Sequence, residues 1–197
     1  MPVRLRIPRR KSRLRARLRV LAETSLRLVI VAGLLCSEFV PAIFGAPPSL
    51  EYQVKAAFLF NFTKFVQWPA AAYPSANAPF TICILGDDPF GRALDDIVQG
   101  ESVNGHKIDV ERIRADAQTN CQVEYVARNS SIPPIASAAG SGVLTVGEGD
   151  EFVRQGGIVG FILDDRRVRF EINLKAAMNA GLKLSSKLLA VARSVEK

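Results

Sequence analysis

The sequence predicts an α/β protein, a three-layer α/β/α sandwich whose mainly parallel sheet carries an antiparallel hairpin at one edge. Short apolar segments of strand length alternate with helical patterns along most of the chain, an order typical of a parallel sheet covered by helices. Residues 156–163 form a nearly unbroken apolar run, as expected for a strand buried on both faces. Residues 167–173 alternate apolar and charged side chains, and the short polar turn 164–166 makes the two segments a hairpin.

The first 46 residues are predicted to form an export signal. A basic stretch precedes a short apolar core at 28–36, and small residues follow near Ala42 and Ala46, where a signal peptidase would cleave. The apolar core is about half of the roughly 20 residues that a membrane-spanning helix needs. We therefore expect an exported, periplasmic protein. Retention of the segment as an inner-membrane anchor is the alternative.

Most of the positive charge lies in this leader. The chain has 26 basic and 19 acidic residues, of which ten and two lie in residues 1–46, so residues 47–197 carry 16 basic and 17 acidic residues. A body without a basic excess offers no general attraction for phosphates, which excludes a nucleic-acid partner. Residues 47–197 are long enough for one domain with a sizeable core.

Residues 50–67 are predicted to form an aromatic-rich helix. Ser49 is a suitable N-cap, and the helix ends before Pro69 because the residue preceding proline disfavours the helical conformation. The apolar side chains follow one stripe that is expected to face the core: Val54, Phe58, Phe62 and Phe65.

A predicted strand at 80–85 is followed by Gly86, Asp87 and Asp88, and then by a helix at 90–99. A strand, a turn and a helix N-terminus mark the place where doubly wound folds bind ligands. The glycine-rich phosphate-binding motifs are missing, however, and two carboxylates would repel an anion. We expect the carboxylates to cap the helix. A ligand site at this edge of the sheet is the alternative.

The other elements follow from the same patterns. They are strands at 107–113, 122–126 and 143–146, a short helix from Pro133 to Gly140, a brief helix within 147–154, a helix over 174–180 capped by Asn173 and ended by Gly181, and a last helix capped by Ser185.

Loss of the leader would leave two cysteines, Cys83 and Cys121. An exported chain with one pair of cysteines most simply forms one disulfide, which here would join two neighbouring strands. Two separate buried thiols are the alternative. A metal site is not expected, because His106 is the only histidine and no Cys-x-x-Cys motif occurs.

Enzymatic activity and a cofactor are not expected either. A catalytic serine or cysteine needs a nearby base, and the sequence has neither a G-x-S-x-G motif nor a free cysteine if the disulfide forms. The pattern does not bring these carboxylates together as a catalytic pair: Asp87, Asp95, Asp164 and Glu171.

Five blocks of the chain together resemble the YfiR family. They are KAAFLFNFTKFVQWP at 55–69, LTVG at 144–147, GG at 156–157, RFEIN at 169–173 and AGLKLSSKLL at 180–189. Each block alone is weakly specific. All five occur in the family's order, and the resemblance covers essentially residues 50–195.

The resemblance implies a periplasmic regulator rather than an enzyme. Such a protein binds the periplasmic part of an inner-membrane signalling protein, expected to be a diguanylate cyclase, and represses it, which lowers cyclic-di-GMP signalling. A homodimer and an OmpA-like outer-membrane lipoprotein that sequesters the repressor are further implied partners. Cys83 and Cys121 match one disulfide of the family, and this sequence has no second pair.

The family's C-terminal surface is thought to bind the partner. By position the resemblance points to these residues: Phe161, Leu163, Arg169, Glu171, Asn173 and Leu182. The alternative for them is that they only pack and cap the hairpin. The alternative function is a periplasmic small-molecule binding module without a cyclase partner, whose ligand lies at the carboxyl edge of the sheet near 86–88.

Overall fold

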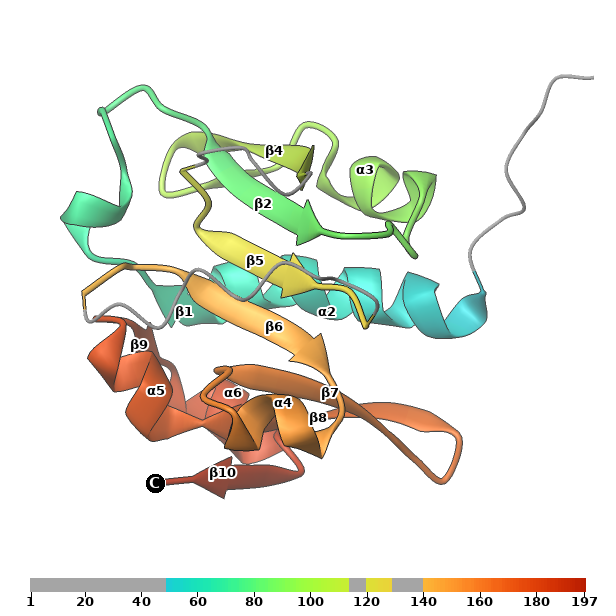
Figure 1. Ribbon diagram of the computed structural model, residues 1–197. Coiled ribbons are helices and arrows are strands. Elements are labelled where there is room, and N and C mark those ends of the chain that lie inside the picture. Colours follow the sequence, from blue (N-terminus) through green and yellow to red (C-terminus); the bar gives the residue numbers. More distant parts are fainter. Residues whose placement is uncertain (1–48, 114–119, 129–139) are drawn as a thin grey trace, which may run out of the picture. The chain divides into compact units, whose positions relative to one another are not determined.

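A computed structural model describes residues 49–113, 120–128 and 140–197. Within these residues, an eight-stranded sheet forms the centre of the fold (Figure 1). Its five parallel strands lie in the order β4 (His106–Ile113), β2 (Phe80–Leu85), β5 (Val123–Val126), β6 (Leu144–Glu148) and β7 (Val159–Asp164). The chain starts at β2, adds β4 on one side and the later strands on the other, which is the order of a doubly wound α/β fold. The predicted fold class is confirmed.

The predicted hairpin is formed by β7 and β8 (Arg167–Asn173), which pair antiparallel. Its two turn residues, Asp165 and Arg166, both have positive φ angles, of 47° and 62°, as a tight two-residue hairpin turn requires. One detail differs from the prediction: the hairpin is not the outermost part of the sheet. A short strand, β10 (Ser194–Glu196), pairs parallel with β8 and covers that edge.

Short strands complete the described sheets. β3 (Ser102–Val103) pairs antiparallel with β4 and forms the other edge of the main sheet. A separate two-stranded sheet joins β1 (Val66–Gln67) to β9 (Lys183–Leu184). This pairing ties the segment after the first helix to the C-terminal region.

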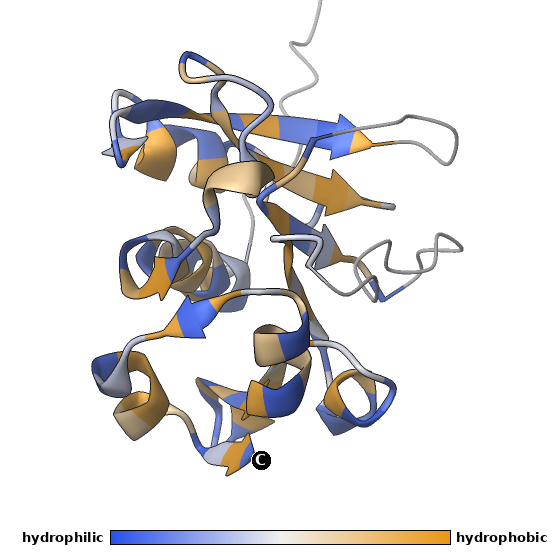
Figure 2. Ribbon diagram, turned by 90° about the vertical axis from the view of Figure 1, so that its left-hand side faces the viewer, coloured by the Kyte–Doolittle hydropathy of each residue, from blue (hydrophilic) through white to orange (hydrophobic). Residues whose placement is uncertain are grey.

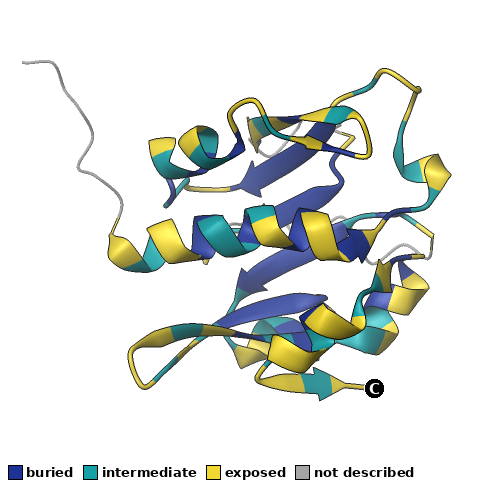
Figure 3. Cartoon of the chain, turned by 180° about the vertical axis from the view of Figure 1, so that it is seen from behind, coloured by how far each residue is buried: buried dark blue, intermediate teal, exposed yellow. Residues whose placement is uncertain are grey.

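Helices cover both faces of the main sheet. α2 (Leu50–Phe65) crosses one face, with α3 (Arg92–Val98) beside it (Figure 3). α6 (Ser186–Val191) lies on the same side, because it lines a groove together with α2. α4 (Asp150–Arg154) packs on the opposite face against β7 (Figure 1), and α5 (Leu174–Asn179) lies beside β9 and β10.

The central strands are buried on both faces. All six residues of β2 are buried, and hydrophobic residues dominate β2 and β5 (Figure 2). Phe80, Ile82 and Ile84 belong to the large core beneath α2, whereas Cys83 and Leu85 belong to a smaller cluster on the other face. Each such side chain contributes roughly 1.5–3 kcal/mol by leaving water.

A buried glutamine holds the loop between α2 and β2. The Gln122 side chain accepts from the Thr81 N–H at 2.7 Å and donates to the Ala72 carbonyl at 2.6 Å. The Gln122 carbonyl accepts from Trp68 Nε1 at 3.0 Å. These bonds fix the short 3₁₀ turn η1 (Ala70–Ala72) against the sheet.

The predicted helix caps are confirmed at the C-terminal end. Asn173 Oδ1 accepts from the Ala176 N–H at 2.8 Å, and Ser185 Oγ accepts from the Leu188 N–H at 3.2 Å. Gly181 has the positive φ angle expected of a residue that ends a helix. The export signal and the helix beginning at Pro133 lie outside the described residues. Among the residues described, no helix is long and apolar enough to cross a membrane.

The predicted core stripe of α2 is confirmed for Phe58 and Phe62, whose rings pack against core phenylalanines of β7 and β8, and is wrong for its other two members. Of its four members only Phe62 is fully buried, whereas Val54 and Phe65 are exposed and Phe58 is half-buried. The buried side of the helix consists of Lys55, Ala56, Leu59, Phe62 and Thr63. The helix is apolar around most of its circumference, so the hydrophobic pattern alone does not decide which side faces the sheet.

Candidate partner-binding surface

The end of the β7–β8 hairpin projects beyond the neighbouring strands (Figures 1 and 3). Leu163 pairs with Val168 and Ile162 pairs with Arg169, so the two pairs point to opposite faces of the hairpin. Leu163 is 57 % exposed. Arg169 is exposed and forms no hydrogen bond or ion pair with any described residue. Both side chains are therefore available to a partner.

Glycines allow α4 to lie close against the strands beside this hairpin. The ring of Phe152 occupies the space that a side chain at Gly147 or Gly157 would need. At Gly160 a Cβ atom would lie 2.7 Å from Val153 Cγ2, again inside van der Waals contact. These small residues therefore set the position of α4 and of the charged side chains that it carries.

A cleft of about 310 Å³, here called the hairpin cleft, opens between α4, the hairpin and Arg193. Its lining residues are Asp150, Arg154, Ile162, Leu163, Asp164, Glu171 and Arg193. Arg193 donates from Nη1 to Glu171 Oε1 at 2.9 Å, and its Nε lies 3.3 Å from Asp164 Oδ2. On α4, Arg154 Nη1 lies 3.0 Å from Asp150 Oδ2. The cleft thus presents charges of both signs next to the exposed Leu163.

Ion pairs in the hairpin cleft favour the charged forms of Arg193 and Asp150 by shifting the pKa of each. The hydrogen bond to Glu171 raises the pKa of Arg193, and Arg154 lowers the pKa of Asp150. Because these pairs are solvent-exposed, each adds little to stability. Their main physical effect is a fixed pattern of charge that a complementary partner can recognise.

The six residues predicted to bind a partner do not share one surface. Phe161 and Leu182 are buried in the core, so neither can contact a partner directly, and we correct the prediction for these two. Asn173 caps α5 and also donates to the Val153 carbonyl at 3.3 Å. The remaining three lie at the hairpin surface: Leu163, Arg169 and Glu171.

Cys83 and Cys121 form a disulfide, with their Cα atoms 5.8 Å apart. Cys83 lies in β2, and Cys121 lies just before β5, the strand that pairs with β2. The bond lies in the smaller hydrophobic cluster, on the face of the sheet opposite α2. It stabilises the sheet at a distance from the hairpin and is not part of the hairpin cleft.

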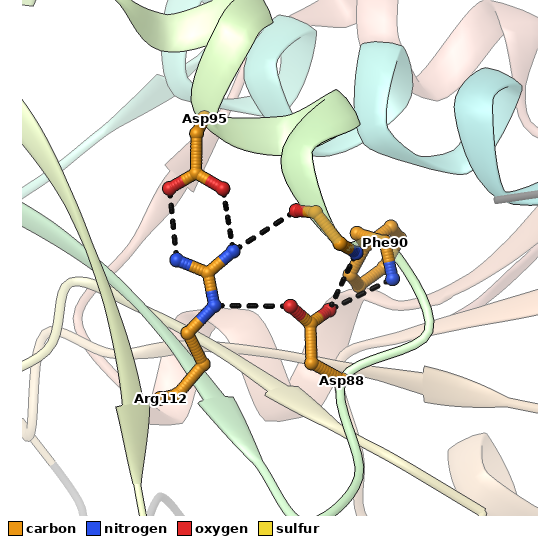
Figure 4. A network of polar contacts seen from close by, with 5 residues as sticks. Asp88, Phe90, Asp95 and Arg112 are labelled. Atoms are coloured by element: carbon orange, nitrogen blue, oxygen red, sulfur yellow. Dashed lines mark hydrogen bonds and ion pairs between the residues drawn. The ribbon is translucent and has the colours of Figure 1, made fainter. Parts of the chain in front are cut away.

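The carboxyl end of β2, the alternative ligand site, is occupied by an internal ion network (Figure 4). Asp88 Oδ1 accepts from the N–H groups of Phe90 at 2.7 Å and Gly91 at 3.2 Å, in the turn before α3. The predicted cap is wrong, because α3 begins at Arg92 with Gly91 as its N-cap and receives no side-chain cap. Arg112, at the end of β4, donates to Asp88 Oδ2 at 3.0 Å and to both oxygens of Asp95 at 2.8 and 2.6 Å. The hydrogen bonds from Arg112 lower the pKa of Asp95. Asp88 is therefore engaged within the protein rather than free for a ligand.

A second polar cluster, which no sequence pattern predicted, lies between α2 and the end of β6. Lys55 Nζ lies 3.0 Å from Glu148 Oε1 and 2.5 Å from Glu51 Oε1. Tyr125 donates its hydroxyl proton to the same Glu148 oxygen at 2.5 Å, and Arg128 Nε donates to Glu148 Oε2 at 2.7 Å. An isolated lysine within an aromatic helix gave no signal by itself, because its acidic partner lies far away in the sequence.

Burial and charge both perturb this cluster. Burial raises the pKa of Glu148, but hydrogen bonds from Tyr125 and Lys55 lower it more, and the net pKa lies below the usual value. Burial, together with Glu148, raises the pKa of Tyr52 to about 12 and also raises the pKa of Tyr125. Every polar atom named here has a partner. The arrangement therefore fixes α2 on the sheet.

The described part of the chain contains no group of three or more histidine, cysteine or acidic side chains that could hold a metal ion.

A family model described as YfiR/HmsC-like matches residues 52–193. The chain belongs to the YfiR/HmsC-like family. Within this YfiR/HmsC-like protein, the matched range contains both bonded cysteines and the whole hairpin cleft. A comparison with curated proteins finds no significant match.

Proposed function

We propose that this YfiR/HmsC-like protein is a periplasmic regulator that binds the periplasmic part of an inner-membrane diguanylate cyclase and represses it. The family match over residues 52–193 is the observation that carries the proposal. The role is one of binding rather than catalysis. Repression would lower the cyclic-di-GMP that the cyclase produces in the cytoplasm.

Export to the periplasm is part of the proposal. The basic and apolar pattern of residues 1–46 supports a cleaved signal peptide. The Cys83–Cys121 disulfide supports an oxidising compartment, because such bonds are rare in the reducing cytosol. The single domain of residues 47–197 would then be the mature protein.

The hairpin is the proposed contact surface for the cyclase. Leu163 supplies an exposed apolar anchor, and Arg169 and Glu171 supply charges on the other face of the same hairpin. Within the hairpin cleft, Leu163 lies beside charged side chains, Asp164 and Arg193 among them, and an apolar side chain bordered by charged groups is typical of a specific protein interface. An OmpA-like outer-membrane lipoprotein would release the cyclase if it bound an overlapping part of this surface.

Repression needs a difference in affinity between two states of the cyclase. A regulator shifts a receptor only by binding its inactive state more tightly than its active state. A change from 1:99 to 99:1 in favour of the inactive state requires a preference of about 10⁴-fold. A homodimer that contacts both halves of a dimeric cyclase would reach such a preference with a modest contribution from each contact.

The test is intracellular cyclic-di-GMP in the source organism with the gene deleted and then restored. Deletion should raise cyclic-di-GMP, and the wild-type gene should reverse the rise. Complementation with Arg169→Glu or Leu163→Glu should fail, because each places a carboxylate on the contact surface without breaking an internal polar contact. Glu171→Lys should also fail, but it additionally removes the ion pair with Arg193.

Lys175→Glu is the matched control, because Lys175 is an exposed cation on α5, outside the hairpin cleft. It should restore repression fully. All variants must reach the periplasm in equal amounts, as measured by immunoblotting of periplasmic extracts. Unchanged cyclic-di-GMP on deletion of an expressed gene contradicts the cyclase proposal. Full repression by both hairpin variants contradicts the proposed surface.

A further inference from the structure

One edge of the sheet is left open along most of its length. β3 covers only the start of β4, where Val103 pairs with His106. The Ile108 N–H then donates to the Glu101 carbonyl at 3.1 Å, and among the described strands none pairs with residues 109–113 on this side. We call residues 109–113 the β4 edge. A strand edge of this kind presents backbone groups that a further strand can bind.

The β4 edge is separate from the hairpin cleft. Figure 1 shows β4 and the β7–β8 hairpin at opposite ends of the sheet, and β2, β5 and β6 lie between them. A partner at the β4 edge would therefore occupy a different surface from the cyclase contact proposed above.

The pairing of β4 shows which of its backbone groups point away from the sheet. The Ile108 N–H points toward β3, and the backbone groups of a strand alternate between its two sides, so the N–H and C=O groups of Val110 and Arg112 point outward as well. Residues 109–113 all pair with β2 on their inner side. The outward groups are therefore held in place before a partner binds, which lowers the cost of ordering them.

Two exposed carboxylates, Asp109 and Glu111, alternate with these outward groups. They share the face of the sheet on which the disulfide lies, and neither forms a hydrogen bond or ion pair with any described residue. On the other face, Arg112 is bound to both Asp88 and Asp95, so this group of three has a net negative charge. The β4 edge therefore attracts a positively charged segment from both faces.

We propose that the β4 edge binds an extended segment of another protein by strand addition, antiparallel to β4, with lysine or arginine at alternate positions of the segment. The basic side chains would lie beside Asp109 and Glu111, and the residues between them would bond the outward groups of Val110 and Arg112. β3 already pairs antiparallel with β4 on this side, and antiparallel pairs are the more stable kind. A matching segment of five residues is about 17 Å long.

The same charges disfavour a second copy of this chain as the occupant. An antiparallel pair of β4 edges that uses Val110 and Arg112 of both copies has its two-fold axis at Glu111. It places the two Glu111 carboxylates directly opposite each other, and like charges in that position destabilise a strand pair. The edge thus rejects its own copy and accepts a basic segment.

The first experiment titrates the protein, purified after expression of the full chain, with the acetylated and amidated peptide TKVKVKT. Its lysines would lie level with Asp109 and Glu111, and its valines level with Val110 and Arg112. In nuclear magnetic resonance spectra the amide signals of Val110 and Arg112 should shift, with a dissociation constant below about 1 mM. The peptide TEVEVET, in which glutamate replaces each lysine, should not bind.

Hydrogen exchange shows whether the backbone of the β4 edge takes part. In the free protein the N–H groups of Val110 and Arg112 point outward, so they should exchange faster than those of Asp109 and Glu111, which face β2. Saturating peptide should slow the exchange of the two outward groups at least about tenfold.

Backbone methylation of the peptide separates strand addition from attraction by charge alone. In an antiparallel strand, the peptide residues opposite Val110 and Arg112 direct their N–H groups toward the β4 edge. N-methylation of the two valines should therefore raise the dissociation constant at least about tenfold, because it removes both donors. N-methylation of the first and third lysines is the matched control and should change the constant by less than about twofold, because their N–H groups point away.

An exchange of charges tests the role of the two carboxylates. Asp109→Lys combined with Glu111→Lys should abolish binding of TKVKVKT and allow binding of TEVEVET. Glu196→Lys, at an exposed carboxylate on β10 at the opposite edge of the sheet, is the matched control and should bind TKVKVKT as the wild type does. Circular dichroism should be alike for all of these proteins, because the three carboxylates are exposed.

Three outcomes would overturn the proposal. They are no binding of TKVKVKT up to about 1 mM, equal binding of the valine-methylated and unmodified peptides, and concentration-dependent shifts of the Val110 amide without peptide, which would indicate a second copy as the occupant. Leu163→Glu should leave peptide binding unchanged, whatever its effect on cyclic-di-GMP, because the hairpin lies at the other end of the sheet. This proposal and the cyclase proposal therefore depend on different measurements.

Discussion

Lys55 Nζ lies 3.0 Å from Glu148 Oε1, and the two side chains are only 3 % and 2 % exposed. The pair joins α2 to the end of β6 in the middle of the fold. A buried ion pair of this kind contributes little net stability compared with apolar residues, but loss of one partner leaves an uncompensated buried charge. It also determines which side of α2 faces the sheet, and hence which apolar side chains remain outside.

Lys55→Met should lower the free energy of unfolding by about 1.5–3 kcal/mol, because Glu148 then loses its buried counter-ion and keeps only the exposed Arg128 as a cationic partner. Urea unfolding at neutral pH measures this change. Lys64→Met is the control on the same helix. Its partner Glu101 lies 3.6 Å away and both side chains are exposed, so the cost should be below about 1 kcal/mol. Equal costs for the two variants would contradict the role of the buried pair.

The stability of the protein should fall in acid, and Glu148 should account for part of the fall. The folded-state pKa of Glu148 lies below its value in the unfolded chain, which is close to 4.5. Its contribution is therefore fully present above pH 4.5 and is lost as the pH falls through the folded-state pKa.

Glu148→Gln tests this dependence in unfolding experiments across the acid range. The variant should be clearly less stable than the wild type at neutral pH, because Lys55 and Arg128 lose their carboxylate partner. The difference should shrink as the pH falls below 4.5, where the wild-type carboxylate also becomes protonated. A difference that does not change with pH would show that the charge of Glu148 is not the cause.

The disulfide should make a large contribution to stability. Cys83 and Cys121 are separated by 38 positions, and closing a loop of this size stabilises the folded state by about 4 kcal/mol in the chain-entropy model. Reduction, or the double change Cys83→Ala with Cys121→Ala, should lower the unfolding midpoint accordingly. Reductant should have no further effect on the double variant. A wild type whose unfolding is insensitive to reductant would contradict this prediction.

The hairpin and its caps were predictable because their signals are local. The alternation of residues 167–173, the polar turn before it and the asparagine at its end are all contained in a short stretch. The polar turn at Asp88 was predictable for the same reason, but Asp88 bonds the turn before α3 and does not cap the helix, which begins at Arg92. The fold class followed from the order of such segments.

The features that were missed depend on distant residues or on very short segments. The orientation of α2 depends on Glu148, which no pattern within the helix reveals. β10 has three residues and no periodicity of its own, and it is held by Arg193 through its N–H to the Phe170 carbonyl at 2.8 Å. The burial of Phe161 agrees with the apolar run of residues 156–163, which predicted a strand buried on both faces, so its assignment to a partner surface conflicted with its own segment.

The close approach of α4 to the sheet leads to a last prediction. Gly157→Ala should destabilise the protein by about 1–3 kcal/mol, because the new methyl group would overlap the ring of Phe152. Phe152→Leu should partly relieve the overlap, so the double variant should cost less than the sum of the two single changes. Chemical denaturation of the four proteins gives this coupling energy. Strict additivity would contradict the contact.

Displacement of α4 would also distort the hairpin cleft, so Gly157→Ala should weaken repression of the cyclase. Phe152→Leu in the same chain should recover part of that repression.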